Sequence, residues 1–149
     1  MIQNKQHTKV CITYVRPHNI TATTCNSSDS FQRWVWTRHS QLYHVETSKC
    51  IQQGKIIFTD ETWYLDLQEC NMTEKKQKWN CDAPFSIRRL GTKTTAQEVN
   101  IYITYENDTI LAKVGLNVAT ATWIRKHQSN TMTEICYSYE FSVVFFPKW

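Results

Sequence analysis

The chain has 149 residues, of which 41% are hydrophobic and 13% aromatic, so it can bury the core of one domain and is not a disordered chain. Its 17 basic and 13 acidic residues give a net charge of +4, an excess too modest to require nucleic acid and only weakly suggestive of an acidic or sulfated partner. No apolar run approaches the roughly 20 residues of a membrane span, and the N-terminus lacks the apolar core of a signal peptide.

The cysteines and glycosylation sequons indicate an oxidising compartment. The six cysteines form no Cys-x-x-Cys pair, and the five histidines share no ligand spacing, so we expect disulfides and no metal site or cofactor. Asn-x-Ser/Thr sequons occur at Asn19, Asn26, Asn71 and Asn107. We therefore expect an extracellular or lumenal protein whose export signal lies upstream, and a chain that is a fragment or truncated form of a membrane receptor.

A repeated motif organises the sequence. Cys25-Asn is followed by five residues and then Gln-Arg-Trp34, and Cys70-Asn by five residues and then Gln-Lys-Trp79. A third tryptophan, Trp123, follows Trp79 by 44 residues, close to the 45 residues between Trp34 and Trp79. Three units of this length, each closing on a tryptophan, predict a threefold internal repeat.

The first two units have clear strand patterns. In residues 1–36 a strand is expected at 9–15, after a weakly apolar first strand whose only inward candidate is Ile2. In residues 40–81 strands are expected at 42–45, 55–58 and 63–67. Along the last of these, two leucines and Trp63 alternate with polar residues, which is typical of a half-buried strand.

The third unit, residues 84–126, is the most divergent. Strands are expected at 85–87, 99–105 and 109–114, and Ala121 stands where the other units have glutamine. Because no segment has a sustained helical period, the sequence predicts an all-β fold.

Three such units have a simple physical interpretation. A unit of about four strands cannot bury its own apolar face, whereas three units around a pseudo-threefold axis close a small barrel and share one core. The sequence therefore predicts a β-trefoil with three Gln-x-Trp-type repeats. Trp34, Trp36 and Trp79 are expected in the core, and the glutamine two residues before each tryptophan is expected to bond the backbone of its own unit.

The repeat also favours one disulfide pattern among the 15 that six cysteines allow. Equivalent positions in units one and two favour Cys11–Cys25 and Cys50–Cys70, which leaves Cys81 with Cys136. Each of the three disulfides is expected to contribute about 2–4 kcal/mol to stability.

The Gln-x-Trp repeats resemble those of ricin B-type lectins. More closely, Trp34-Val-Trp, the run from Leu42 to Cys50 and Gln77-Lys-Trp-Asn-Cys81 resemble the N-terminal cysteine-rich domain of the mannose receptor family. This resemblance covers about residues 2–136. It implies a β-trefoil recognition domain with three disulfides that opens a type I endocytic receptor. We expect a domain at 1–136 and a divergent tail at 137–149.

In the mannose receptor itself, the resemblance implies a site for sulfated N-acetylgalactosamine in the third unit. The ligand tryptophan there lies three residues before the closing core tryptophan. With Trp123 as the core residue, the ligand position is Thr120 and has no aromatic ring. Counting back from Cys136 instead places Trp123 on the ligand position. Thr120, Trp123 and the basic residues Arg125 and Lys126 are the candidate ligand-binding set.

Three function hypotheses follow. The first is a lectin for sulfated or otherwise anionic glycans, whose basic residues could include Arg88, Arg89, Lys93 and Lys113, although a scattered solvated surface is the simpler interpretation of these four. The second is a protein-interaction or architectural trefoil without a sugar site, which binds a secreted protein such as a phospholipase A2 or contacts neighbouring receptor domains. A trefoil inhibitor or cytokine is the third, and the Gln-x-Trp repeats argue against it.

Two observations distinguish these hypotheses. An exposed aromatic residue beside Arg125 and Lys126 would favour the lectin, whereas a buried Trp123 would favour the protein-interaction module. A ricin-type galactose site needs an aspartate shortly after the first cysteine of a unit, which is absent after both Cys11 and Cys50. No catalytic motif or acid/base pair is evident, so we expect no enzymatic activity.

Overall fold

The computed structural model describes most of the chain as β-strand. Within the described part there are two single-turn 3₁₀ helices and no α-helix. The described residues are 1–4, 9–16, 19–57, 61–82, 86–93, 95–106, 109–115, 121, 123–126 and 132–134.

Unit one consists of β1 (Ile2–Asn4), β2 (Val10–Arg16), β3 (Asn19–Thr24), η1 (Ser30–Gln32) and β4 (Trp34–Trp36). The strand predicted at 9–15 is confirmed as β2. The first strand is an internal strand, because it pairs with β2 on one side and with β12 on the other. Its inward residue is buried in the core as the pattern predicted.

Unit two consists of β5 (Leu42–His44), β6 (Lys49–Ile56), β7 (Thr62–Glu69), η2 (Lys75–Gln77) and β8 (Asn80–Asp82). The strand predicted at 55–58 is wrong in its bounds, because β6 begins six residues earlier. The two glutamines at 52 and 53 weakened the apolar pattern there. Both side chains find hydrogen-bond partners, so polar residues are accommodated within the strand.

Unit three consists of β9 (Ser86–Thr92), β10 (Glu98–Glu106), β11 (Thr109–Val114) and β12 (Trp123–Lys126). A further short strand, β13 (Met132–Glu134), pairs with β12. The predicted strands at 99–105 and 109–114 are confirmed, and the one at 85–87 extends further along the chain than predicted.

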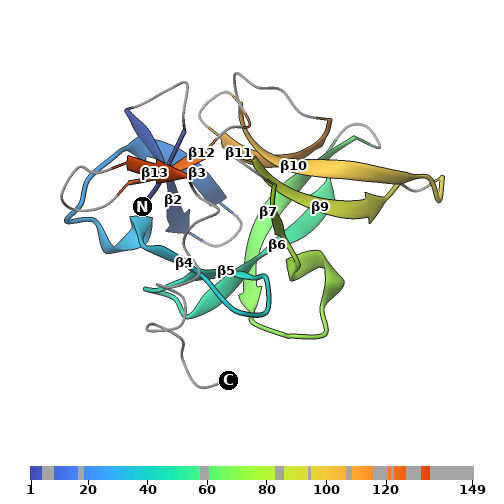
Figure 1. Ribbon diagram of the computed structural model, residues 1–149, viewed down its shortest axis with the longest axis horizontal. Coiled ribbons are helices and arrows are strands. Elements are labelled where there is room, and N and C mark those ends of the chain that lie inside the picture. The colour runs from blue at the N-terminus through green and yellow to red at the C-terminus, as the bar shows by residue number, and fades with distance from the viewer. Residues whose placement is uncertain are drawn as a thin grey trace.

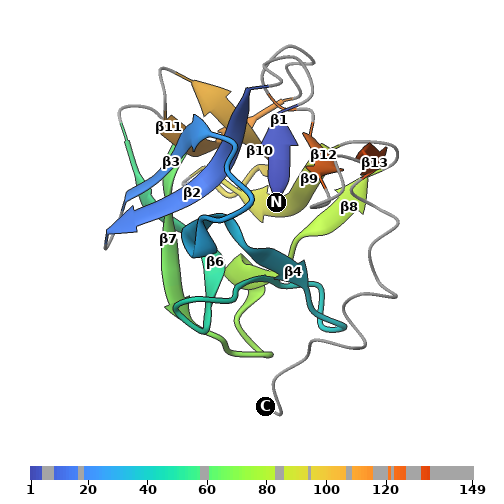
Figure 2. The same cartoon turned by 90° about the vertical axis from the view of Figure 1, so that its left-hand side faces the viewer.

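The strand pairing repeats three times. The last strand of each unit pairs with the first strand of the next, as β4–β5, β8–β9 and β12–β1, so that the third pairing closes the ring. The two middle strands of each unit form a hairpin, and β11 also pairs with β3 and β7. Figure 1 shows β11 between β3 and β7, and Figure 2 shows β1 near β12. This arrangement confirms the β-trefoil.

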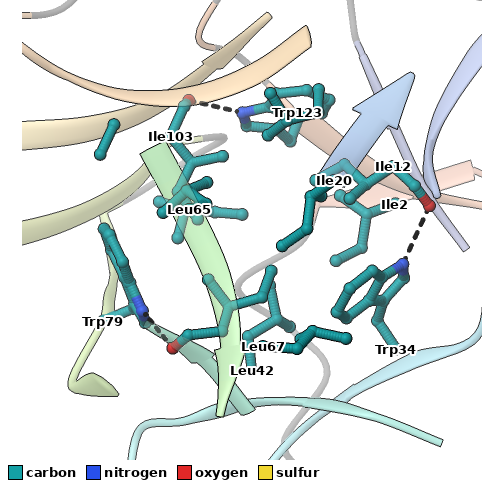
Figure 3. Packing of buried hydrophobic residues seen from close by; sticks show 14 of the residues in the cluster. Ile2, Ile12, Ile20, Trp34, Leu42, Leu65, Leu67, Trp79, Ile103 and Trp123 are labelled. Atoms are coloured by element: carbon teal, nitrogen blue, oxygen red, sulfur yellow. Dashed lines mark hydrogen bonds between the residues drawn. The ribbon is translucent and has the colours of Figure 1, made fainter. Parts of the chain in front are cut away.

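Three tryptophans mark the threefold symmetry of the core (Figure 3). Trp34, Trp79 and Trp123 are 7%, 1% and 0% exposed. Each indole Nε1 donates a hydrogen bond to an isoleucine carbonyl oxygen in the second strand of its own unit. The pairs are Trp34 with Ile12 at 2.9 Å, Trp79 with Ile51 at 3.1 Å and Trp123 with Ile103 at 2.9 Å. The tryptophans therefore occupy equivalent core positions, which confirms the placement of Trp123 from the repeat period.

Aliphatic side chains fill the space between the indoles. Leu65 and Leu67 of β7 are buried with Trp63, whereas Tyr64 is exposed, so the predicted alternation is confirmed. Trp36 is partly buried and packs against the same cluster. The core thus draws on all three units, and no unit has a core of its own.

Two of the three predicted disulfides are confirmed. Cys11 of β2 bonds Cys25, which follows β3, and Cys50 of β6 bonds Cys70, which follows β7, with sequence separations of 14 and 20 residues. The third predicted pair is Cys81 with Cys136. The side chain of Cys81 and the whole of Cys136 lie outside the described residues. Each confirmed bond holds the loop that leads toward the tryptophan of its unit.

Candidate functional site

A buried glutamine anchors the loop after each confirmed disulfide. In unit one, the backbone N–H of Asn26 donates to Gln32 Oε1 at 2.8 Å, and Gln32 Nε2 donates to the Thr24 carbonyl at 2.9 Å. In unit two, Asn71 N–H donates to Gln77 Oε1 at 2.9 Å, and Gln77 Nε2 donates to the Glu69 carbonyl at 2.9 Å. The predicted role of these glutamines is confirmed.

These anchors fix a surface position immediately before each glutamine. This residue, three before the core tryptophan, is Phe31 in unit one and Lys76 in unit two, and both are exposed. Each lies on the 3₁₀ helix of its unit, near the first strand of the next. We call the surroundings of Phe31 the first junction, those of Lys76 the second junction, and the equivalent place between β12 and β1 the third junction.

The first junction is aromatic. His44 of β5 has its ring centroid 4.4 Å from Trp34, 5.4 Å from Tyr14 and 6.2 Å from Phe31. Tyr14 of β2 lies 6.3 Å from Phe31. These rings lead from the core tryptophan outward to Phe31, which is 39% exposed.

His44 is the buried polar centre of this cluster. The side chain is 0% exposed, and hydrogen bonds join Nδ1 to Thr47 Oγ1 at 2.8 Å and Nε2 to the Phe31 carbonyl oxygen at 2.9 Å. Burial lowers the pKa of His44 from its ordinary value. The Phe31 carbonyl and the carboxylates of Glu46 and Asp29 oppose this shift without cancelling it. His44 is therefore held in its neutral form at pH 7.

This burial predicts a pH-dependent stability. Below pH of about 6.5 the unfolded chain takes up a proton at His44 that the folded chain resists, so the free energy of unfolding falls as the pH falls toward the folded pKa. Denaturant titrations from pH 7.5 to 5 are expected to show this loss, with a slope of at most about 1.4 kcal/mol per pH unit from this residue. His44→Gln should reduce the slope. Equal slopes in the wild type and this variant would contradict the prediction.

The second junction is cationic and differs in its chemistry. Arg89 of β9 is the equivalent of His44 of β5. The strand pairing shows this equivalence, because Arg88 pairs with Asn80, the residue after Trp79, and Tyr43 pairs with Val35, the residue after Trp34. The Arg89 guanidinium donates to Gln53 Oε1 and to the Lys75 carbonyl oxygen at 3.2 Å. Burial lowers the pKa of Arg89, and the nearby carboxylate of Glu74 opposes that shift. At 8% exposure this arginine joins units two and three, so its assignment to a solvated surface is wrong.

The other basic residues considered for an anion-binding patch have local partners. Lys93 Nζ lies 3.1 Å from Glu61 Oε1, and Lys113 Nζ lies 3.1 Å from Glu106 Oε2. Arg88 donates to Asn100 Oδ1 at 2.8 Å. Carboxylates neutralise two of these cations, which argues against a single basic surface built from them.

The ligand-binding residues expected from the sequence belong to the third unit. Trp123 is fully buried, so its ring is not offered to a ligand. Thr120 lies outside the described residues, as do the side chains of Arg125 and Lys126 in β12. Ala121, at the place of the anchoring glutamine, is fully buried. The structure therefore shows no exposed aromatic ring in the described part of this junction.

Two of the four glycosylation sequons are described with their side chains. Asn26 and Asn71 are exposed and begin the loops that precede η1 and η2. Asn107 and the side chain of Asn19 lie outside the described residues. Among the described residues no group of three or more His, Cys, Asp or Glu side chains could hold a metal ion, and no helix has the length and apolarity to cross a membrane.

Sequence reasoning missed the aromatic cluster of the first junction. Its members come from β2, η1 and β5, and their spacing in the chain forms no motif. One signal was present in the repeat. The position three residues before the closing tryptophan, considered only in unit three, is an aromatic residue in unit one.

Comparison with protein families agrees with this architecture. The family model of the ricin-type beta-trefoil lectin domain matches residues 1–101. A comparison with curated proteins finds no match. The family match covers both Gln-x-Trp units, their disulfides and the start of the third unit. The chain therefore belongs to the ricin-type β-trefoil lectin domain family.

Proposed function

We propose that this protein is an extracellular recognition module that binds carbohydrate and has no catalytic role. The observation that carries the proposal is the family match across the two intact Gln-x-Trp units. The two disulfides and the exposed sequon asparagines Asn26 and Asn71 support an extracellular or lumenal location. An affinity for glycans is the property that this family and fold together favour most.

The proposal extends to the origin of the chain. Its cysteine and tryptophan motifs support a place in an endocytic receptor of the mannose receptor family. In this interpretation residues 1–136 are the cysteine-rich domain, closed by a third disulfide between Cys81 and Cys136, and residues 137–149 are a tail particular to this chain.

The specificity of the third junction follows from the position of Trp123. The burial of that ring supports the assignment of Thr120 to the position at which the mannose receptor stacks a tryptophan on the sugar. Arg125 and Lys126 would still favour an anionic group such as a sulfate. We infer that this junction recognises sulfated glycans weakly for want of an aromatic surface.

Replacing Thr120 with tryptophan is expected to restore that surface. On an array that includes 4-sulfated N-acetylgalactosamine, Thr120→Trp should bind this sugar at least about 10-fold more tightly than the wild type, since a stacking contact contributes roughly 1.4 kcal/mol or more. Thr120→Val is the matched control and should behave as the wild type. Tight wild-type binding that Thr120→Val abolishes would contradict this assignment.

The burial of Trp123 also favours a second candidate, a protein-interaction or architectural module. Such a trefoil would bind a secreted protein, for example a phospholipase A2, or contact neighbouring receptor domains. The same array separates the candidates. If the oxidised, folded domain binds no glycan of any class, carbohydrate recognition is wrong and protein partners take its place.

A further inference from the structure

The first two units have a glycosylation sequon at the same place in the repeat. Asn-Ser-Ser at 26–28 directly follows the second cysteine of unit one, and Asn-Met-Thr at 71–73 directly follows the second cysteine of unit two. The corresponding segment of unit three, residues 115–122, contains no Asn-x-Ser/Thr sequence. The repeat therefore provides two matched acceptor sites, one beside each of the two junctions that the structure describes.

Each asparagine uses its amide oxygen within the loop and leaves its amide nitrogen unused. Asn26 Oδ1 accepts the Ser28 N–H at 3.0 Å. Asn71 Oδ1 accepts the Thr73 N–H at 3.0 Å and the Thr73 hydroxyl at 2.8 Å. Among the described residues, no hydrogen bond involves the Nδ2 atom of either asparagine. Both residues are exposed, so a glycan on Nδ2 fits the folded loop without breaking a hydrogen bond.

The modification is a group transfer whose second reactant is a lipid-linked oligosaccharide diphosphate. The asparagine Nδ2 forms a bond with the anomeric carbon of the first sugar, and the bond between that carbon and the phosphate oxygen breaks. The lipid diphosphate leaves with the bonding electron pair, and the amide nitrogen loses one proton. Because the product is still an amide, Oδ1 remains the acceptor that the loop uses.

Each sequon lies beside the surface residue of its junction, because one buried glutamine positions both. In unit one, the Asn26 N–H donates at 2.8 Å to Gln32 Oε1, and Phe31 is the residue directly before this glutamine. In unit two, the Asn71 N–H donates at 2.9 Å to the glutamine that directly follows Lys76. An N-linked glycan is bulky, so one on either asparagine covers the neighbouring surface of its own loop.

Exposed apolar side chains of the two junctions are consistent with such a cover. Phe31 is 39% exposed, and Met72, the middle residue of the second sequon, is 48% exposed. Val45, which follows the buried His44 of the first junction, is 39% exposed. Glycans make a surface more soluble, and apolar side chains beneath them are kept from contact with other proteins.

We propose that Asn26 and Asn71 carry N-linked glycans that cover the first and second junctions and exclude ligands from both. The inference goes beyond the proposed function, because the cover acts on a glycan ligand and on a protein ligand alike. It rests on the extracellular or lumenal location proposed above, since the donor lipid is met only on that route.

The test begins with the first junction. The full chain is expressed behind a secretory leader in mammalian cells, and mass spectrometry after enzymatic release locates each modified asparagine as an aspartate. Ser28→Ala removes the sequon and keeps Asn26, whereas Ser27→Ala is the matched control that keeps the sequon. Loss of the glycan is expected to raise oxidation of Phe31 by hydroxyl radicals at least about 3-fold. Tyr64, exposed on β7, should be unchanged.

The second junction is tested with a lysine reagent. Thr73→Ala removes the sequon at Asn71, and Met72→Ala keeps it. Thr73→Ala is expected to raise acetylation of Lys76 at least about 3-fold over the wild type, because the bulky glycan no longer restricts the reagent. Met72→Ala should behave as the wild type. Lys55, exposed near the far end of β6, should react equally in all three proteins.

The outcomes decide the inference without any ligand. Unmodified asparagines in the exported wild type overturn it, and modification at one site alone overturns it for the other junction. Equal labelling with and without the glycan also overturns it, because the junction would then be open. If a variant fails to fold, trimming the glycans of the folded wild type with an endoglycosidase gives the same comparison, and unchanged labelling overturns the cover. Carbohydrate recognition is decided separately by the glycan array.

Discussion

Replacing Trp123 with alanine is expected to lower the free energy of unfolding by about 3–5 kcal/mol, the usual cost of truncating a fully buried tryptophan. The change leaves a cavity where three units meet and removes the hydrogen-bond partner of the Ile103 carbonyl. Since such a loss is a large part of the stability of a domain of this size, the variant should be largely unfolded at 37 °C. Denaturant titration followed by tryptophan fluorescence measures the effect.

Trp123→Phe is the informative companion variant. It keeps most of the ring volume and loses the indole N–H, so it should cost clearly less than the alanine change. If Trp123→Ala were as stable as the wild type, the core position assigned to this residue would be wrong. A loss of glycan binding in Trp123→Ala therefore has to be read together with its stability, because unfolding alone would abolish binding.

Gln77→Leu is expected to cost about 2–4 kcal/mol, although leucine is apolar and close to glutamine in size. Gln77 Oε1 accepts from Asn71 N–H at 2.9 Å and from Gln41 Nε2 at 2.8 Å, and its Nε2 donates to Gln52 Oε1 at 3.0 Å. The Glu69 carbonyl also loses its donor. Several groups in a buried network are then left without partners, and each contributes a desolvation cost.

The measurement is again the free energy of unfolding, with Lys76→Ala as the control. Lys76 is adjacent in sequence and exposed, so its replacement should change stability by less than about 0.5 kcal/mol. Equal stability of the two variants would show that the glutamine network is not what orders the loop from Asn71 to Trp79. It would also weaken the argument that Gln32 fixes the position of Phe31.

The two junctions that the structure describes show how one scaffold acquires different surfaces. The backbone pairing, the core tryptophan and the anchoring glutamine are the same in units one and two. The side chain taken from the next unit differs, being a neutral imidazole in one case and a guanidinium in the other. The chemistry of the junctions can therefore differ between units without a change in the core.

The sequence by itself determined the β-trefoil, its repeat period and the two disulfides that the structure describes. These features depend on short-range patterns. The Cys-Asn…Gln-x-Trp motif joins groups that meet within one unit, and the alternation along Trp63, Leu65 and Leu67 reports directly which face of β7 is buried. The period also placed Trp123 in the core without any reference to the divergent loop before it.

Only the tertiary structure decided what lies between the units. The start of β6 at Lys49 could not be predicted from the apolar pattern, because Gln52 and Gln53 interrupt it. Their hydrogen-bond partners lie 25 and 36 residues away in the sequence. The sequence suggested a surface position for Arg89, whereas its hydrogen bond to Gln53 places it between units two and three. The cluster of Tyr14, Phe31 and His44 forms because β5 pairs with the last strand of the preceding unit. Composition and periodicity describe one element at a time, and contacts between units depend on how the closed barrel brings those elements together.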